Sequence, residues 1–210
     1  MTPTEVAATR PRIEGDREQE ILTATLDVLA DVGYDRLTMD AVATHARASK
    51  ATLYRRWNGK VSLIIDALLS QKGAPAAPDT GSLRGDLLEA FCGMGSLTDQ
   101  RQLAVLAAVI TAIARDAEFA AAFREQFIGP KAAAVRLIFQ RAIDRGEIRD
   151  DVDLDIITAA LPGIVLHRQF LLGEQPTQDL IVRVIDQIIL PSVLTQHPSQ
   201  TRDDNEKESK

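Results

Sequence analysis

The sequence predicts an all-α protein. From residue 16 onward, apolar side chains recur at intervals of three and four residues, as on one face of a 3.6-residue helix. Glycines and prolines stand between these periodic segments, where helices begin or end. Valine and isoleucine are plentiful, but no clean period-two run occurs, so strands are not expected.

The composition is that of a globular protein. The 210 residues allow one large domain or a small domain joined to a larger one. No apolar run reaches the roughly 18 residues that a membrane span requires, so no membrane partner is expected. The first twelve residues contain no apolar core of a secretory signal, and the single cysteine, Cys92, forms no intrachain disulfide. We therefore expect a cytoplasmic protein.

The charge is distributed unevenly along the chain. The formal net charge is −6, which by itself argues against a nucleic-acid partner. From Arg36 to Lys60, however, six cations and one anion give a net charge of +5, so the rest of the chain carries −11. A basic segment on an acidic body can still meet phosphate, because salt screens charges beyond roughly 8–10 Å. A solvated charged face without a partner is the alternative that charge alone leaves open.

Short helices are expected in residues 16–70. Gly33 ends the first helix, and Thr38 and Ser49 offer side-chain oxygens as N-caps of the next two. The helix from Ser49 to Trp57 buries Leu53 and Trp57, four residues apart, and a well-buried helix follows over residues 60–70. Residues 1–15 are expected to form a disordered arm.

A larger helical domain is expected over residues 71–194, after a loop rich in glycine and proline at 73–81. Pro130 suits the first turn of its helix and is expected to force Gly129 out of that helix. The tail 195–210 is expected to be disordered. The helices expected in this domain cover 82–95, 101–115, 118–128, 130–145, 153–172 and 177–194.

The segment from Thr38 to Lys60 has the layout of a helix-turn-helix. Its second helix presents small and polar side chains that would fit a major groove about 12 Å wide. Lys60 combines a cation with free backbone amides at a helix start, which suits an anion. An ordinary exposed helix is the alternative. The residues expected to contact DNA are Thr38, Arg47, Ser49, Lys50, Ala51, Thr52, Tyr54, Arg55 and Lys60.

These motifs resemble the tetracycline-repressor (TetR) family over about fifty residues, Glu20–Leu69. The anchors keep their mutual spacing: Gly33-Tyr34, Thr38, Ser49, Leu53-Tyr54 and Lys60. The resemblance implies a dimeric regulator, mostly a repressor, whose C-terminal helical domain binds a small molecule and dimerises. It also favours a phosphate-contacting role for Tyr54 over the alternative that Tyr54 is a core residue.

The sequence departs from the family pattern at two positions. Arg47 stands at a turn position that is usually glycine, and a side chain there costs about 1 kcal/mol if φ is positive. Trp57 stands where phenylalanine or tyrosine is commoner, and its spacing from Leu53 indicates a core residue.

Aromatic residues in the C-terminal domain are candidates for an effector pocket, although each on its own could be ordinary core. Three polar residues lie among them on an otherwise apolar helix. They suit an apolar or weakly polar organic effector better than a phosphorylated metabolite. The candidate residues are Phe91, Met94, Phe123, Phe127, Phe139, His167, Arg168, Gln169 and Phe170.

The last two expected helices are apolar on more than one side. Such helices are central core or an interface. The family resemblance implies that they form a four-helix contact with a second copy of the chain, through Leu161, Ile164, Val165, Leu166, Ile181, Val184, Ile185, Ile188 and Ile189.

Two other classes of protein remain as alternatives. A helical enzyme would need catalytic residues, and no metalloprotease, nucleophile-elbow or phosphate-loop motif occurs in the sequence. An adaptor that keeps the helix-turn-helix without DNA would not need the excess of cations before Lys60. The three histidines have no carboxylate or thiol partner at ligand spacing, and Cys92 suits an inert buried thiol. No metal or cofactor is therefore expected. The predicted partners are a near-palindromic operator in double-stranded DNA, a small organic effector and a second copy.

Overall fold

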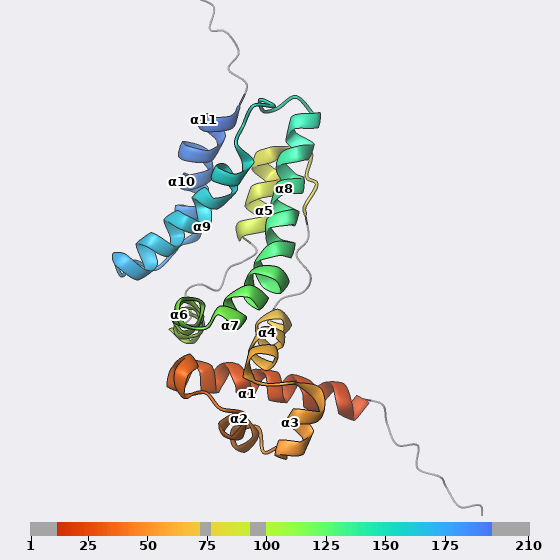
Figure 1. The fold of residues 1–210 in the computed structure, drawn as a ribbon. Helices are drawn as coiled ribbons and strands as arrows, with labels where there is room; N and C mark the ends of the chain where they lie inside the picture. Colours follow the sequence, from red (N-terminus) through yellow and green to blue (C-terminus); the bar gives the residue numbers. More distant parts are fainter. Residues whose placement is uncertain (1–11, 72–76, 93–99, 195–210) are drawn as a thin grey trace, which may run out of the picture. The chain divides into compact units, whose positions relative to one another are not determined.

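The computed structural model describes residues 12–71, 77–92 and 100–194, and helices make up most of this part (Figure 1). Within these residues the only β pairing is an isolated antiparallel bridge between Ile148 and Leu194, so the all-α prediction is confirmed. The expected arm lies mainly, and the expected tail and Met94 entirely, outside the described residues. The elements are α1 (Arg12–Arg36), α2 (Met39–His45), α3 (Lys50–Arg56), α4 (Lys60–Ser70), α5 (Leu83–Cys92), α6 (Gln100–Arg115), α7 (Ala117–Ala122), the π-helix η1 (Phe123–Ile128), α8 (Gly129–Asp144), α9 (Leu154–Leu171), α10 (Gln178–Val184), the π-helix η2 (Ile185–Ile189) and α11 (Leu190–Val193).

The residues expected to begin or end the first helices do so in the structure. Gly33 adopts φ 74 and breaks α1 into two helical parts. The hydroxyl of Thr38 accepts a hydrogen bond from the amide of Ala41 at 3.1 Å, and this caps α2. The hydroxyl of Ser49 accepts from the amide of Thr52 at 3.1 Å, and this caps α3. These side-chain bonds satisfy amides that would otherwise lack a partner at each helix start.

Two compact units make up the chain. The first unit contains α1–α4, α6, α7, η1 and the first residues of α8. In it, α6, α4 and α2 pack on α1, and α3 packs on α2 (Figure 1). Its core is apolar, with Leu29, Val42, Leu53, Leu63 and Ile64 fully buried. The core therefore fixes the helices that would carry the DNA-contacting side chains.

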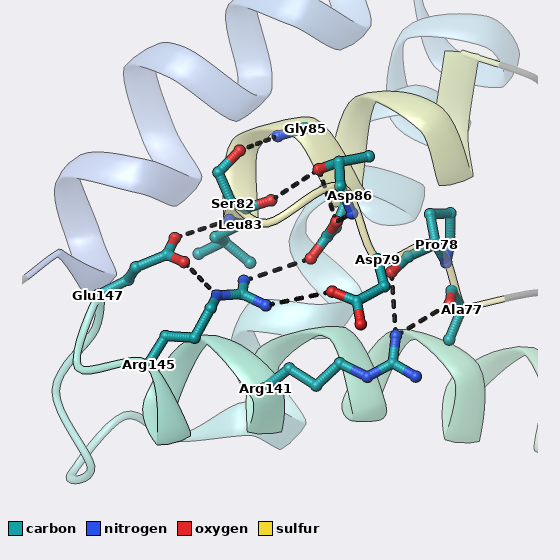
Figure 2. Close-up of polar contacts among 11 residues, drawn as sticks. Ala77, Pro78, Asp79, Ser82, Leu83, Gly85, Asp86, Arg141, Arg145 and Glu147 are labelled. Carbon is teal, nitrogen blue, oxygen red and sulfur yellow. Dashed lines mark hydrogen bonds and ion pairs between the residues drawn. The ribbon is translucent and has the colours of Figure 1, made fainter.

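The second unit contains α5, the rest of α8, α9, α10, η2 and α11. A polar cluster at the start of α5 anchors it to α8, as Figure 2 shows. The buried Asp86 accepts hydrogen bonds from the amide and hydroxyl of Thr80, at 2.6 and 2.7 Å, and from Arg145 at 3.3 Å. Glu147 accepts from the amide of Leu83 at 2.7 Å. A Cβ on Gly85 would lie 2.2 Å from the Thr80 hydroxyl, so this close approach requires glycine.

Two expectations about helix boundaries are wrong. Gly129 is helical, with φ −52 and ψ −52, and it begins α8 directly after η1. Proline disfavours the helical conformation of the preceding residue partly by clashing with its Cβ, which Gly129 lacks. Trp57 lies outside α3 as its C-cap, with the extended angles φ −121 and ψ 131. The expectation that Trp57 is core is confirmed, since its side chain is buried and its indole N–H donates to Asp66 at 2.9 Å.

Candidate nucleic-acid interface

The two sides of α3 differ sharply. Leu53 is fully buried and attaches the helix to the first unit. Lys50, Ala51, Tyr54 and Arg55 are exposed, and Tyr54 retains 57% of its accessible surface. A core tyrosine would be covered, so the exposure of Tyr54 favours the phosphate-contacting role over the core alternative. The arrangement leaves a polar and cationic face free to enter a groove of DNA.

The hydroxyls at the start of α3 are already engaged with one another. Ser49 Oγ lies 2.8 Å from Thr52 Oγ1, and Ser49 also caps the helix. Each hydroxyl keeps further capacity for hydrogen bonds, because it carries one donor and two acceptor lone pairs. Thr38, the cap of α2, is exposed in the same region of the chain. These groups can therefore donate to or accept from DNA without leaving their caps.

Carboxylates engage two of the cations on α3. Lys50 Nζ lies 2.5 Å from Asp40 Oδ2, and this ion pair raises the pKa of Lys50 above its ordinary value. Arg56 pairs with Glu18 of α1 at 2.9 Å. Both pairs are exposed, so they are weak enough for phosphate to replace them. The paired lysine therefore keeps its charge near neutral pH, and a phosphate in place of Asp40 would preserve an ion pair.

Lys60 has a different environment from the other predicted contacts. Its ammonium lies 3.9 Å from the centre of the Tyr34 ring and 3.4 Å from the Tyr34 carbonyl oxygen. The Tyr34 hydroxyl donates to the carboxylate of Asp116, which also accepts from the amide of Phe119 at 3.0 Å and so caps α7. Burial and the hydrogen bond to Asp116 raise the pKa of Tyr34, and the same bond lowers the pKa of Asp116. Lys60 is thus part of a set of contacts that links α1, α4 and α7.

Two residues of α1 near this face were not foreseen. Arg17 donates to the carbonyl oxygens of Ala46 and Arg47, at 2.9 and 2.6 Å, and Glu18 holds Arg56. Their partners lie about thirty and forty positions later in the chain, so no local pattern connects them. Arg47 itself is exposed and has φ 51, the left-handed conformation on which its predicted strain depends.

The candidate pocket residues are distributed over both units. Phe123 and Phe127 stack at 4.9 Å in the first unit, and Phe123 also stacks with Phe119 at 5.9 Å. Phe139 is buried in the second unit, where Arg168 pairs with Glu174. The remaining described candidates range from half-buried to exposed. Phe91 and Gln169 are half-buried, and His167 and Phe170 are exposed.

Gln169 is unusual within this set. Its Oε1 atom is buried, and it has no hydrogen-bond partner among the described residues. A buried acceptor without a donor is destabilising and calls for a physical reason.

Away from these candidates, an open groove of about 700 Å³ lies on the surface between α1 and the end of α2. Arg17, Asp27, His45 and Arg47 are among the residues that line it. His45 has a carboxylate neighbour in space after all, because its Nε2 lies 3.7 Å from Asp27. No group of three or more metal-ligating side chains occurs among the described residues.

The residues expected at a dimer contact are partly inside the protomer. Leu161, Val165, Val184, Ile185 and Ile189 are buried within it, and Ile164 and Ile181 are half-buried. Leu166 and Ile188 are exposed, by 38% and 43%. Other exposed apolar residues extend this surface along α9 and just beyond its end, namely Ile156, Phe170, Leu171 and Leu172.

Helix α9 is long and apolar enough to cross a membrane by length and composition, and only 11% of it is buried in the protomer. Helices of soluble proteins also reach this length and hydropathy. In the protomer, the apolar side chains of Ile156, Phe170 and Leu171 on α9 are exposed.

Comparisons with known protein families cover nearly the whole chain. Residues 21–74 match the family model described as bacterial regulatory proteins, tetR family. Residues 77–188 match the model described as tetracyclin repressor-like, C-terminal domain.

Individual relatives give the same result. The chain is 38% identical over 189 residues to the HTH-type transcriptional regulator Rv1556 of Mycobacterium tuberculosis, covering 88% of this chain and 92% of that protein. It is 34% identical over 180 residues to the DNA-binding transcriptional repressor TetR of Mycobacteroides abscessus, covering 83% and 92%. The crystal structure of the TetR family transcription regulator SCO0332 aligns with a TM-score of 0.61 at 28% identity, covering 81% of this chain and 94% of that chain.

Proposed function

This chain belongs to the tetracycline-repressor (TetR) family of transcriptional regulators, and we propose that it is a dimeric, cytoplasmic repressor that a small effector releases from its operator. The observation that carries the proposal is the exposed face of α3, with Lys50, Tyr54 and Arg55 outward and Leu53 buried. The relative from Mycobacteroides abscessus is named a repressor, which supports repression over activation.

In this proposal residues 16–70 bind DNA and residues 71–194 bind the effector and dimerise. Two protomers place their α3 helices in successive major grooves of a near-palindromic operator. Lys50, Arg55 and Tyr54 contact phosphates, and Ser49, Ala51 and Thr52 lie against base edges. Thr38, Arg47 and Lys60 complete the predicted contacts at the borders of the motif.

We expect Lys50→Ala and Tyr54→Phe each to weaken DNA binding and to leave the fold intact, because both side chains are exposed. Loss of the Lys50 phosphate contact should make the negative slope of log K against log salt shallower by about 0.9. Fluorescence anisotropy with a fragment selected from genomic DNA, at two salt concentrations, measures both effects.

The matched control for Lys50 is Arg149→Ala. Arg149 is an exposed cation that pairs with Asp151 at 3.1 Å, as Lys50 pairs with Asp40, and no DNA contact is expected there. Thermal melting should show that all three variants fold. If Lys50→Ala and Tyr54→Phe bind as tightly as wild type at both salt concentrations, α3 does not contact DNA.

The uncovered apolar side of α9 supports a homodimer. A second copy would cover Leu166, Ile188 and their exposed neighbours Phe170 and Leu171, which a free protomer leaves in water. A dimer also supplies the two recognition helices that a near-palindromic site requires.

The effector we propose is a small, largely apolar molecule with a hydrogen-bond donor. Gln169 Oε1 is a buried acceptor without a partner among the described residues, and a bound donor would satisfy it. Aromatic side chains of the C-terminal region, such as Phe170 and Phe91, would supply apolar contact area. The effector must bind the two conformations of the protein unequally if it is to release DNA.

A thermal-shift screen of apolar compounds tests this part of the proposal. A ligand present at 100 times its Kd should stabilise the fold by about 2.7 kcal/mol and raise the melting temperature by several degrees. Each compound that binds should also lower operator affinity. Gln169→Met should weaken the binding of compounds that carry a hydrogen-bond donor. It should leave DNA binding by the effector-free protein unchanged.

The possible outcomes separate the parts of this proposal. Stabilising compounds that leave operator affinity unchanged would show a pocket without coupling. A sugar phosphate or a metal ion as the natural effector would contradict an apolar pocket.

The two alternative classes are less well supported. The named relatives are transcriptional regulators, which gives no support to a helical enzyme. An adaptor that does not bind DNA would show no retention of any genomic fragment in the selection described above.

A further inference from the structure

The turn between α2 and α3 holds a strained residue. Arg47 has φ 51 and is the only non-glycine residue with positive φ among the described residues. Around it, the amide of Ala48 donates to the Ala43 carbonyl at 2.8 Å, and the amide of Arg47 donates to the Thr44 carbonyl at 3.1 Å. This pair of bonds is the Schellman ending of a helix, in which the left-handed position strongly favours glycine. The side chain of Arg47 makes this conformation costly, and contacts from outside the turn would offset that cost.

Arg17 supplies such contacts. One terminal nitrogen of its guanidinium donates to the carbonyl oxygens of Ala46 and Arg47, at 2.9 and 2.6 Å. These carbonyls lie where the chain leaves α2, beyond the reach of the next turn of helical amides. An ion pair with Glu20, one turn further along α1, fixes the orientation of the guanidinium. The guanidinium of Arg17 thus contacts Glu20 of α1 and the carbonyl oxygens of the α2–α3 turn at the same time.

The next residue of α1 reaches the opposite end of α3. Glu18 Oε1 accepts from Arg56 Nη2 at 2.9 Å and from Arg56 Nε at 3.3 Å. The start of α1 therefore contacts both the turn before α3 and its last turn. Within α3 only Leu53 is buried, so this seven-residue helix has few other contacts that fix its direction.

We propose that Arg17 is a positioning residue for DNA binding, which holds the α2–α3 turn with Arg47 in the left-handed conformation and thereby sets the direction of α3. This inference rests on the proposed function. The role of Arg17 is intramolecular, because its guanidinium is occupied by two carbonyl oxygens and a carboxylate. Its contribution to DNA binding is therefore geometric and does not depend on a phosphate contact.

The test is a double-mutant cycle with Arg17→Ala and Arg47→Gly. Arg17→Ala alone should weaken binding to a genomic fragment selected by the wild-type protein about tenfold, because two charge-assisted hydrogen bonds to the turn are lost. The salt slope should not change. In the Arg47→Gly background the same substitution should cost less than about twofold, because glycine adopts positive φ without support.

Arg36→Ala is the matched control. Arg36 is an exposed arginine of α1 whose guanidinium bonds only to the carbonyl of Val32 in the contacts that the structure defines, at 3.0 Å. Its removal takes the same charge from the same helix, and it should leave the effect of Arg47→Gly unchanged.

Amide hydrogen exchange gives a second readout that needs no DNA. The amides of Arg47 and Ala48 should exchange faster in Arg17→Ala and return to wild-type rates when Arg47→Gly is added. If the wild-type protein retains no genomic fragment, the proposed function fails. The exchange rates then still decide whether Arg17 holds the turn.

Three results would overturn the inference. The first is a slope of log K against log salt that is shallower by about 0.9 in Arg17→Ala, with the same loss of affinity in both backgrounds. This result would make Arg17 a direct phosphate contact. An equal loss in both backgrounds at unchanged slope would show that Arg17 acts independently of Arg47. Wild-type affinity and exchange in Arg17→Ala would show that the turn needs no support.

Discussion

Leu166→Glu is expected to convert the protein to monomers, with a dimer dissociation constant raised about a thousandfold. The substitution would occur twice in a two-fold interface and would place two carboxylates in an apolar contact. Leu166 is 38% exposed in the protomer, so the protomer itself should tolerate the change. Sedimentation velocity over a range of protein concentrations measures the change in mass, and operator affinity should fall with it.

Ile110→Glu serves as the control because Ile110 is an equally exposed apolar residue, at 41%, on α6 of the first unit. This variant should remain dimeric. Ile188→Glu, on η2, should dissociate the dimer as Leu166→Glu does. If both variants of the second unit sediment like wild type, the α9 surface is not the interface, and the argument for a near-palindromic operator loses its basis.

Arg145→Met is expected to reduce the free energy of unfolding by about 3 kcal/mol, because it leaves the buried charge of Asp86 without its cation. Methionine fills much of the same volume, so the loss reflects the charge and not a cavity. The melting temperature should fall by roughly 10 °C for a chain of this size.

Arg149→Met is the matched control. Arg149 pairs at 3.1 Å with Asp151, and both side chains are at least half exposed. Such a pair contributes at most about 1 kcal/mol. Equal melting temperatures for Arg145→Met and Arg149→Met would show that the polar cluster at the start of α5 adds no more than an exposed ion pair.

The same cluster predicts a pH dependence. Burial by itself raises the pKa of Asp86, but hydrogen bonds from Thr80 and the contact with Arg145 outweigh burial and lower that pKa below its ordinary value. The carboxylate therefore stabilises the fold fully above its unfolded-state pKa of about 3.9, and this contribution is lost as pH falls through the folded-state pKa. Urea unfolding should show a gap between wild type and Asp86→Asn that is constant near neutral pH and shrinks in acid. A gap that widens in acid would contradict the assignment.

Local features of the fold could be predicted from the sequence because their physical causes are local. Thr38 and Ser49 cap helices whose first amides lie two or three residues away, and Gly33 and Arg47 occupy turns that their neighbours define. The exposed face of α3 follows from Leu53, the buried residue of that helix, whereas Trp57 is buried as the C-cap beyond its end. The family model matches residues 21–74, the part of the chain that contains these local signals.

Contacts between distant parts of the chain could not be predicted in this way. Arg17 meets Ala46 and Arg47 about thirty residues later, and Asp86 meets Arg145 across 59 residues, which only the folded chain brings together. The π-helices η1 and η2 also lack a compositional signal, since they differ from α-helix only by one residue in the hydrogen-bond register. For the effector, the sequence indicates aromatic residues and polar points without the geometry that would bring them together.

The packing of α6 and α7 on α1 determines the smallest DNA-binding segment that could be exchanged between relatives. Residues 16–70 carry the side chains proposed to contact DNA. However, the Tyr34 ring packs at a tilt against the Phe119 ring, with the ring centres 5.1 Å apart. The Tyr34 hydroxyl also donates to Asp116, and Arg115 pairs with Asp35. A chimera joined at residue 71 would replace these partners with those of another protein and would leave Tyr34 without its acceptor. A graft that also carries α6 and α7 would keep both partners of Tyr34. If α5 stays with the recipient's second unit, a chimeric regulator built on this scaffold therefore needs three junctions instead of one.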